Sequence, residues 1–196
     1  MKKINIFLLL LFSININPLA QNCLNSKKML QGYFYAGTSQ LDTKAAGGFY
    51  QSQNQPKKMS SEIENILNGK EVQIVVQKNE IQNFTDEIEG FTVYIINNTD
   101  KAIGLHAQDS RLYVIRQVYF NGKWNDIEFL RSSGCGNSYH KVFAKPNEYW
   151  EFVVPCLKGN FAANFRFKLL LEKDKYIYSN EFTGRFNKRQ LRKKSK

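Results

Sequence analysis

The chain has 196 residues, three cysteines and a formal net charge of +11, which is enough for one ordinary domain plus extensions. Of its 28 Lys and Arg, seven lie in residues 185–196 and two in residues 1–20, which leaves 19 against 17 acidic residues in residues 21–184. The body is therefore nearly neutral, which excludes a basic nucleic-acid-binding face spread over the domain. No nucleic acid is expected as a partner.

Residues 1–20 have the pattern of a bacterial secretory signal peptide. Lys2 and Lys3 form a basic start, residues 4–12 are almost wholly apolar, and the stretch ends at Ala20. This pattern predicts cleavage after Ala20 and export to the periplasm or the exterior. The apolar run is much shorter than the roughly 20 residues that span a bilayer. No transmembrane segment is therefore expected in the mature chain.

The three cysteines are interpreted in the light of export, which permits disulfide bonds. Because Cys23 lies near the start of the mature chain, the expected pair is Cys135 with Cys156, although three cysteines allow other pairings. Closing that loop of about 22 residues stabilises the fold by on the order of 3 kcal/mol in the chain-entropy model. Lipid anchoring through Cys23 is the alternative for this residue, but Asn22 is a poor fit for a lipoprotein signal.

Residues 21–60 are expected to form a flexible leader. The segment is rich in Gln, Asn, Ser and Gly, which favour low order. Its aromatic clusters at residues 33–35 and at Phe49-Tyr50 act against complete disorder. Either cluster is a candidate to lie across a sheet as an added strand or staple.

A short helix is expected over residues 61–69. Ser61 and Glu64 have the spacing of a capping box, in which each side chain satisfies a free backbone N–H at the helix start. Gly69 can take the left-handed conformation that ends a helix. The sequence therefore predicts about two helical turns before the main domain.

From residue 71 onward the pattern is that of strands, because β-branched and aromatic residues recur in runs bounded by turn residues. The expected strands are residues 72–77, 91–96, 112–120, 123–130, 139–144, 149–154, 165–171 and 176–182. Asn121-Gly122 predicts a tight hairpin, and Pro146-Asn147 predicts a second one. The expected fold is all-β: an antiparallel immunoglobulin-like sandwich of seven to eight strands over residues 71–187. A basic tail, residues 188–196, follows it.

The strand order, the turn at residues 97–99 and the terminal hairpin resemble secreted immunoglobulin-like β-sandwich proteins of bacteria. The end of the signal peptide is similar to those of Bacteroidetes-type exported proteins. The resemblance covers residues 71–187 and implies a fold but no catalytic residue. The Cys, Trp, Cys pattern of antibody domains is not matched, because Trp124 precedes both Cys135 and Cys156, and Trp150, which lies between them, is only six residues before Cys156.

Candidate catalytic and metal sites are weak in this sequence. Cys135 and His140 could form a nucleophile–base pair, but such pairs usually assemble from distant segments. A zinc site would have to use His106, Cys135, His140 and Cys156, whose spacing differs from the closely paired ligands of structural zinc sites. We therefore expect no metal and no cofactor.

Two further chemistries depend on residues of the central strands. Glycoside hydrolysis needs two converging carboxylates, and the candidates are Glu128, Glu148 and Glu151. A sugar-stacking platform could use Trp124, Tyr149, Trp150 and Phe152. Successive strand residues face opposite sides of a sheet, however, so Tyr149 and Trp150 cannot share one platform.

The function expected from the sequence is that of an exported, non-enzymatic binding or assembly module of the cell envelope. A carbohydrate-binding module and a peptidase-inhibitor-like sandwich are the alternatives. An envelope or extracellular protein is the expected partner, bound through two neighbouring loops. The candidate loop residues are Gly134, Asn137 and Tyr139 in one loop and Asn97 and Asn98 in the other. A polyanionic surface polymer could contact the tail, through Arg185, Lys188, Arg189, Arg192, Lys193 and Lys194.

Overall fold

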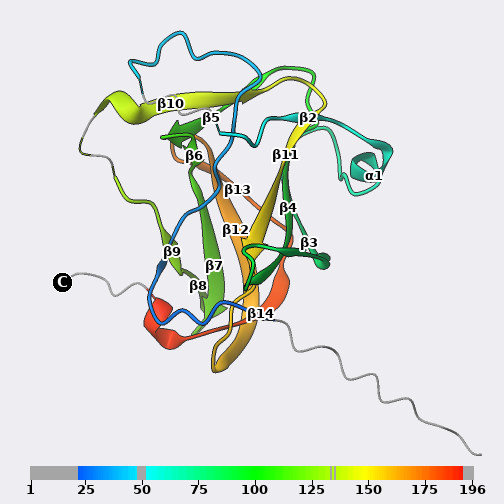
Figure 1. Ribbon diagram of the computed structural model, residues 1–196. Coiled ribbons are helices and arrows are strands. Elements are labelled where there is room, and N and C mark those ends of the chain that lie inside the picture. The colour runs from blue at the N-terminus through cyan, green and yellow to red at the C-terminus, as the bar shows by residue number, and fades with distance from the viewer. Residues whose placement is uncertain (1–21, 48–51, 133, 135, 192–196) are drawn as a thin grey trace, which may run out of the picture.

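The computed structural model describes residues 22–47, 52–132, 134 and 136–191. The expected signal peptide and Phe49-Tyr50 lie outside these ranges. The described chain is all-β, with antiparallel sheets and one short α-helix (Figure 1). None of its helices is long and apolar enough to cross a membrane.

Three antiparallel sheets form the body of the protein. The first sheet has the order β2 (Lys57–Lys58), β11 (Glu148–Pro155), β4 (Glu89–Asn97) and β3 (Val72–Asn83). The second has the order β13 (Lys175–Tyr178), β12 (Phe161–Glu172), β7 (Val114–Phe120) and β8 (Lys123–Asp126), and β14 (Phe182–Phe186) pairs with the other half of β12. The third contains β10 (Tyr139–Ala144), β5 (Ile103–Gln108) and β6 (Arg111–Leu112). Separately, β1 (Leu30–Gln31) pairs in parallel with β9 (Glu128–Phe129).

The main core lies between the first sheet and the other two. Every second residue of β3 and β12 faces the core. Ile74 and Val76 are buried on the side of the first sheet, and Phe167 and Leu169 on the side of the second. Trp150 of β11 is fully buried among them. This burial of alternate residues is what the period-two patterns of the sequence predict.

The helix α1 (Ser61–Glu64) has only four residues and is shorter than expected. Its N-cap is Ser60, and no side-chain capping bond forms, so the predicted capping box at Ser61 is wrong. Ile63 packs on Tyr94 and Ile96 at the outer face of the first sheet. This burial, rather than capping, is the contact that holds the helix.

The Asn121-Gly122 hairpin is confirmed: both residues have positive φ, 53° and 75°, and the flanking strands β7 and β8 pair directly. The second predicted hairpin is wrong. Asn147 has a positive φ of 57°, so the turn at Pro146-Asn147 exists. The strands on either side of it, however, belong to different sheets: β10 pairs with β5 and β11 pairs with β4. The turn is a crossover between layers.

The described part of the leader is packed into the fold, which differs from the expected flexible segment. Phe34 is completely buried, and its ring lies 5.0 Å from that of Phe152 and 5.3 Å from that of Phe167 (centroid distances). The indole N–H of Trp150 donates to the carbonyl of Gly37 at 2.9 Å. The aromatic cluster at residues 33–35 therefore closes one side of the core, as the staple alternative proposed. Figure 1 shows this blue segment running along the front of the sheets.

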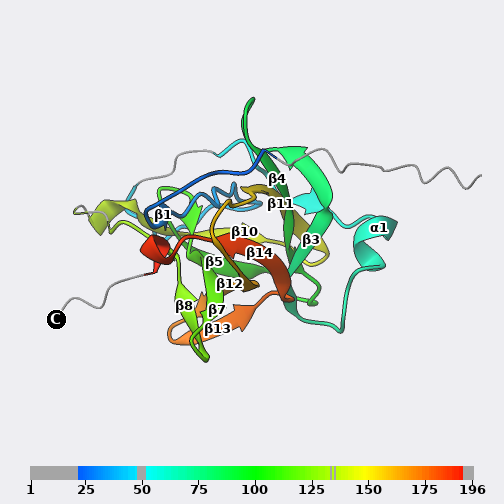
Figure 2. The same ribbon diagram turned by 90° about the horizontal axis from the view of Figure 1, so that it is seen from below.

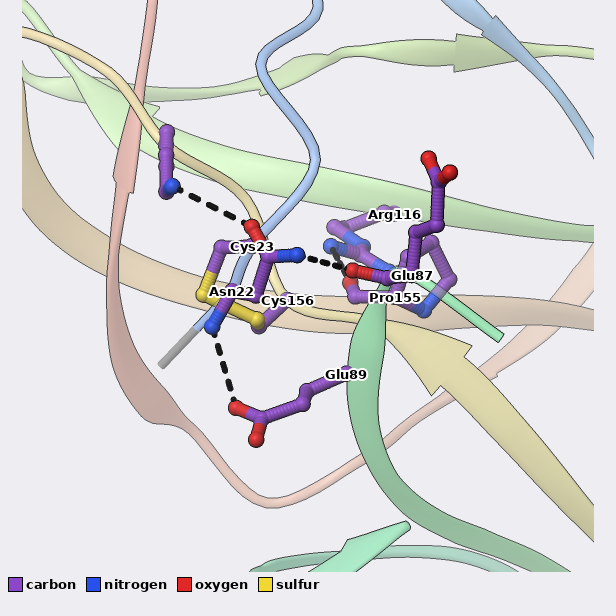
Figure 3. Close-up of a disulfide and its surroundings, with 8 residues drawn as sticks. Asn22, Cys23, Glu87, Glu89, Arg116, Pro155 and Cys156 are labelled. Atoms are coloured by element: carbon purple, nitrogen blue, oxygen red, sulfur yellow. Dashed lines mark hydrogen bonds between the residues drawn. A yellow bond between two sulfur atoms is a disulfide. The ribbon is translucent and has the colours of Figure 1, made fainter. Parts of the chain in front are cut away.

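The disulfide joins Cys23 to Cys156, not Cys135 to Cys156 (Figure 3). Leu24 fixes this pairing, because its N–H donates to Cys156 at 2.8 Å and its carbonyl accepts from Lys158 at 2.9 Å. Sequence reasoning failed because it placed Cys23 in a free leader. A sulfur held in a disulfide cannot carry a lipid, so the bond also excludes anchoring through Cys23 in this form of the chain. Cys135 lies outside the described residues.

The described part of the basic tail is also packed. A short 3₁₀ turn, η2 (Lys188–Gln190), follows β14, and the side-chain oxygen of Gln190 caps its start by accepting from the N–H of Asn187 at 2.8 Å. Gln190 is fully buried, and Leu191 contacts the second hydrophobic cluster around Phe165 and Phe186. Viewed from below, the leader and this C-terminal segment lie side by side (Figure 2). A second 3₁₀ turn, η1 (Gly136–Ser138), precedes β10.

Candidate functional site

A groove of about 730 Å³ runs between β3 and β13. Residues 71–77, at the start of β3, form one wall. Residues 177–180, at the end of β13, form the other. Ile66 and Asn68, from the connection after α1, complete the lining. Each of these two strands is the outermost strand of its sheet, so the groove lies along the open side of the two packed layers.

The backbone of β3 turns toward this groove hydrogen-bonding groups that do not pair with β4. The N–H of Val76 donates to the side-chain oxygen of Asn180 at 2.7 Å, and the side-chain nitrogen of Asn180 donates to the carbonyl of Val76 at 3.0 Å. In an antiparallel ladder, the N–H and C=O of alternate residues point to the same edge. The backbone groups of Val72 and Ile74 therefore face the groove, as those of Val76 do.

Asn180 thus mimics one residue of an added strand. Its side-chain amide makes the two bonds to Val76 that the backbone of a neighbouring strand would make. Asn180 lies in the three-residue break between β13 and β14, where Ser179 instead bonds to Phe167 of β12. The N–H of Ser179 points to β12. Because the backbone groups of successive strand residues point to opposite edges, those of Tyr176 and Tyr178 point away from β12. Two strand edges therefore flank the same groove.

Beside the groove, the outer face of the second sheet carries stacked aromatic and cationic side chains. The guanidinium of Arg166 lies 3.9 Å from the ring centroid of Tyr178 and 4.2 Å from that of Trp124. Lys168 lies 4.7 Å from the ring of Tyr176, and Tyr119 packs on Trp124. Contacts of this kind stabilise a face by about 0.5–1 kcal/mol each when exposed.

The predicted sugar platform is not assembled. Trp150 is buried in the core, and Phe152 is buried beside it. Tyr149 packs on Tyr94 at the outer face of the first sheet, in the cluster that α1 covers. Of the four predicted residues, Trp124 alone lies on the exposed aromatic face.

The two predicted binding loops lie at opposite ends of the β5–β10 pair. Tyr139 is paired with Gln108 at one end, and Ala144 with Ile103 at the other. Six residues of strand at about 3.3 Å each separate them by roughly 17 Å. Gly134 and Asn137 are exposed at the Tyr139 end, and Tyr139 itself is 39% exposed.

Asn97 is a structural residue, which corrects its expected role in binding. It is fully buried, and its side-chain nitrogen donates to the carbonyls of Lys101, Ala144 and Lys145 at 2.8–3.1 Å. It therefore holds together the turn after β4 and the crossover after β10. Asn98 is partly exposed and donates to the carbonyl of Gly69 at 2.6 Å.

The residues considered for catalysis and metal binding are used differently. His140 is buried, with Nδ1 3.1 Å from the carbonyl of Ser138, and its proposed partner Cys135 lies outside the described residues. Burial lowers the pKa of His106, and the charge of Lys141 adds to this effect. Cys156 is bonded to Cys23 and cannot act as a thiolate ligand. Across the described ranges, no group of three or more His, Cys, Asp or Glu is placed to hold a metal ion.

The candidate carboxylates are held in three separate structural contacts. Glu148 accepts from the N–H of Lys145 at 2.7 Å, within the crossover turn. Glu151 forms a surface ion pair with Lys57 at 2.6 Å. Glu128 lies in a buried ion pair. These bonds link parts of the backbone and the leader rather than opening onto a common cleft.

The buried ion pair joins Arg116 of β7 to Glu128 of β9, with 3.2 Å between Nε and Oε1 and both side chains at most 1% exposed. Tyr33 of the leader donates to Glu128 at 2.8 Å and accepts from Arg116. Arg116 also donates to the carbonyl of Pro155 at 3.0 Å (Figure 3). Burial raises the pKa of the Glu128 carboxyl, and the charge of Arg116 opposes this shift. The network ties the leader to both layers.

Sequence reasoning missed the residues that form the groove. Asn180 could have been noticed, because Ser179, Asn180 and Glu181 interrupt the apolar pattern of the last strand with turn-forming residues. Of the predicted tail contacts, Arg185, Lys188 and Arg189 are exposed on β14 and η2. Arg192, Lys193 and Lys194 lie outside the described residues.

The comparisons with known proteins give no family for this chain: no family model, no curated protein and no solved structure matches it.

Proposed function

We propose that this chain is an exported, non-enzymatic binding module of the bacterial cell envelope, which binds a partner protein by strand addition. The observation that carries the proposal is the groove between β3 and β13, where the backbone groups of Val72 and Ile74 are turned to the open side. An extended segment of a partner can pair with such an edge. The pairing supplies the affinity, and pockets for alternate side chains supply the specificity.

The occupant of the groove is an extended segment with alternating apolar side chains. Ile74 and Val76 line the groove from the core side, so inward-facing residues of an added strand would meet an apolar surface. An exposed edge of this kind is a liability for aggregation unless it is covered or used. Asn180 covers the Val76 position only.

We also propose that the fold belongs to the immunoglobulin-like class. Antiparallel sheets that pack face to face, and a crossover that passes from the third sheet to the first, support this assignment. Export is supported by the signal-peptide pattern of residues 1–20 and by the disulfide, which is typical of oxidising compartments.

Photo-crosslinking tests the strand-addition proposal. Tyr178 lines the groove and Tyr119 does not, yet both are 46% exposed, so they form a matched pair of sites for p-benzoylphenylalanine. In the envelope, position 178 is expected to crosslink to a discrete partner and position 119 is not.

Two edge variants sharpen this test. Val72→Pro removes a donor that faces the groove and leaves the bonds to β4 in place, so the crosslink at position 178 should fall roughly five- to tenfold. Asn180→Ala exposes the backbone of Val76 and should raise the yield of the crosslink at position 178. Equal crosslinking from both tyrosines, or a yield that neither edge variant changes, would refute strand addition. Unfolding curves of each variant control for loss of fold.

A further inference from the structure

The described cations at one end of the molecule come from three segments that are distant in sequence. Asn187 links the segments, because its side-chain nitrogen donates to the carbonyl of Ser26 at 2.8 Å and lies 3.5 Å from that of Lys158. Arg185 donates to the carbonyl of Gly159 at 2.7 Å. Residues 24–31, 157–160 and 182–191 therefore meet here. Their cations are Lys27, Lys28, Lys158, Arg185, Lys188 and Arg189.

These three segments contain no Asp or Glu. Within the described residues, none of the six cations forms an ion pair with a carboxylate. The rest of the body has the opposite balance: without its three lysines in this cluster, residues 21–184 hold 16 basic and 17 acidic residues, a net charge of −1. The net positive charge of the described residues is therefore gathered at this end.

The basic end includes a cleft of about 350 Å³. Lys27 of the leader and Lys188 and Arg189 of η2 line it, together with Asn160, Phe161 and Asn187. Lys188 is positioned by that ring, with its Nζ 4.4 Å from the centroid. The capped η2 turn and the buried Gln190 fix the backbone that carries these cations. Residues 187–191 are thus held in place against the leader.

We infer that this basic end is a binding site for an anionic polysaccharide with carboxylate or phosphate groups. Cations of the leader and of residues 185–189 pair with the anionic groups, and the amide of Asn160 and the ring of Phe161 are side chains suited to sugar hydroxyls and ring faces. Exposed large hydrophobic residues, which a membrane-binding surface uses for insertion, are absent from the three segments among the described residues. The site is separate from the strand-addition groove.

Binding to polygalacturonate, with neutral dextran as the reference polymer, tests this inference. The mature full-length protein should bind polygalacturonate but not dextran, with an affinity that falls linearly in log–log form as salt rises. The triple variant K27A/K188A/R189A should weaken binding at least about tenfold and reduce the salt slope by about 2.

A matched triple variant, K101A/K173A/K175A, removes the same charge from exposed lysines at the other end. β12 begins at Phe161, which lines the cleft, and ends at Glu172, so a rise of about 3.3 Å per residue places Lys173 roughly 40 Å further along the strand. This control should bind as the wild type does. Equal weakening in both variants would overturn the site, as would equal binding to dextran. Tighter binding to vesicles containing 30% phosphatidylglycerol would overturn it in favour of a membrane surface.

The strand-addition proposal is tested by different residues. Neither triple variant alters the groove, so crosslinking from position 178 should be unchanged in both. Failure of polygalacturonate binding would leave that crosslink intact, and loss of the crosslink in Val72→Pro would leave polygalacturonate binding intact.

Discussion

Replacing Cys23 with serine is expected to lower the free energy of unfolding by about 4–5 kcal/mol in the chain-entropy model. The disulfide spans 133 of the 196 residues, so its loss releases most of the chain in the unfolded state. Denaturant unfolding under non-reducing conditions measures the effect. Adding a reductant to the wild type should reproduce it.

Cys135→Ser is the matched control for that change. Because Cys156 is already bonded to Cys23, this substitution breaks no disulfide and should lower the free energy of unfolding much less than Cys23→Ser does. Non-reducing peptide mapping should join the fragments that contain Cys23 and Cys156. A larger loss from Cys135→Ser than from Cys23→Ser, or a map that links Cys135 to Cys156, would contradict the pairing.

Glu128→Leu is expected to lower the free energy of unfolding by about 3–5 kcal/mol, because it leaves the buried guanidinium of Arg116 without its counter-ion. Arginine cannot lose its proton to escape this cost. Arg116→Met should cost less, since the Glu128 carboxyl can take up a proton and burial already raises its pKa. Denaturant unfolding at pH 7 compares the two.

The double variant R116M/E128L completes this cycle. It should cost less than Glu128→Leu alone, because no unpaired charge remains in the core. Costs that simply add would show that the two side chains act independently and would contradict the buried pair.

The raised pKa of Glu128 also sets a pH dependence. A carboxyl whose pKa is higher in the folded state stabilises the fold most below its unfolded pKa, near 4.3, and loses this contribution as pH rises through the folded value. As the pH rises from the unfolded to the folded pKa, the free energy of unfolding of the wild type should therefore fall relative to that of Glu128→Gln. A gain over the same window would mean that the attraction to Arg116 outweighs burial.

The sequence predicted the strands best where β-branched and aromatic residues alternate. The patterns around Ile74 and Phe167 matched β3 and β12, because burial of alternate residues is a local signal. The continuous β-branched and aromatic run from Phe91 matched β4, which is buried on both faces. Asn121-Gly122 was equally clear, since this turn type requires positive φ at both residues. β5 was missed because Gly104, His106 and Ala107 lack strand propensity, and its pairing with β10 holds it in place.

Long-range placement could not be predicted from the sequence. The leader looked flexible by composition, but the burial of Phe34 and the pairing of Cys23 depend on surfaces that exist only after the sheets form. The crossover at Pro146-Asn147 looked like a hairpin, because the same turn-forming residues occur whether the next strand pairs with the preceding one or joins another sheet. The groove depends on which strands lie at the edges of their sheets, and the topology of the fold determines this.

Amide hydrogen exchange at β3 tests the strand-addition account most directly. In the free protein, Gln73 and Val75 should exchange slowly, because they face β4, whereas Val72 and Ile74 should exchange rapidly. When the partner crosslinked from position 178 is bound, Val72 and Ile74 should become as protected as Val75. Slow exchange at Val72 and Ile74 in the free protein, or unchanged exchange in the complex, would contradict it.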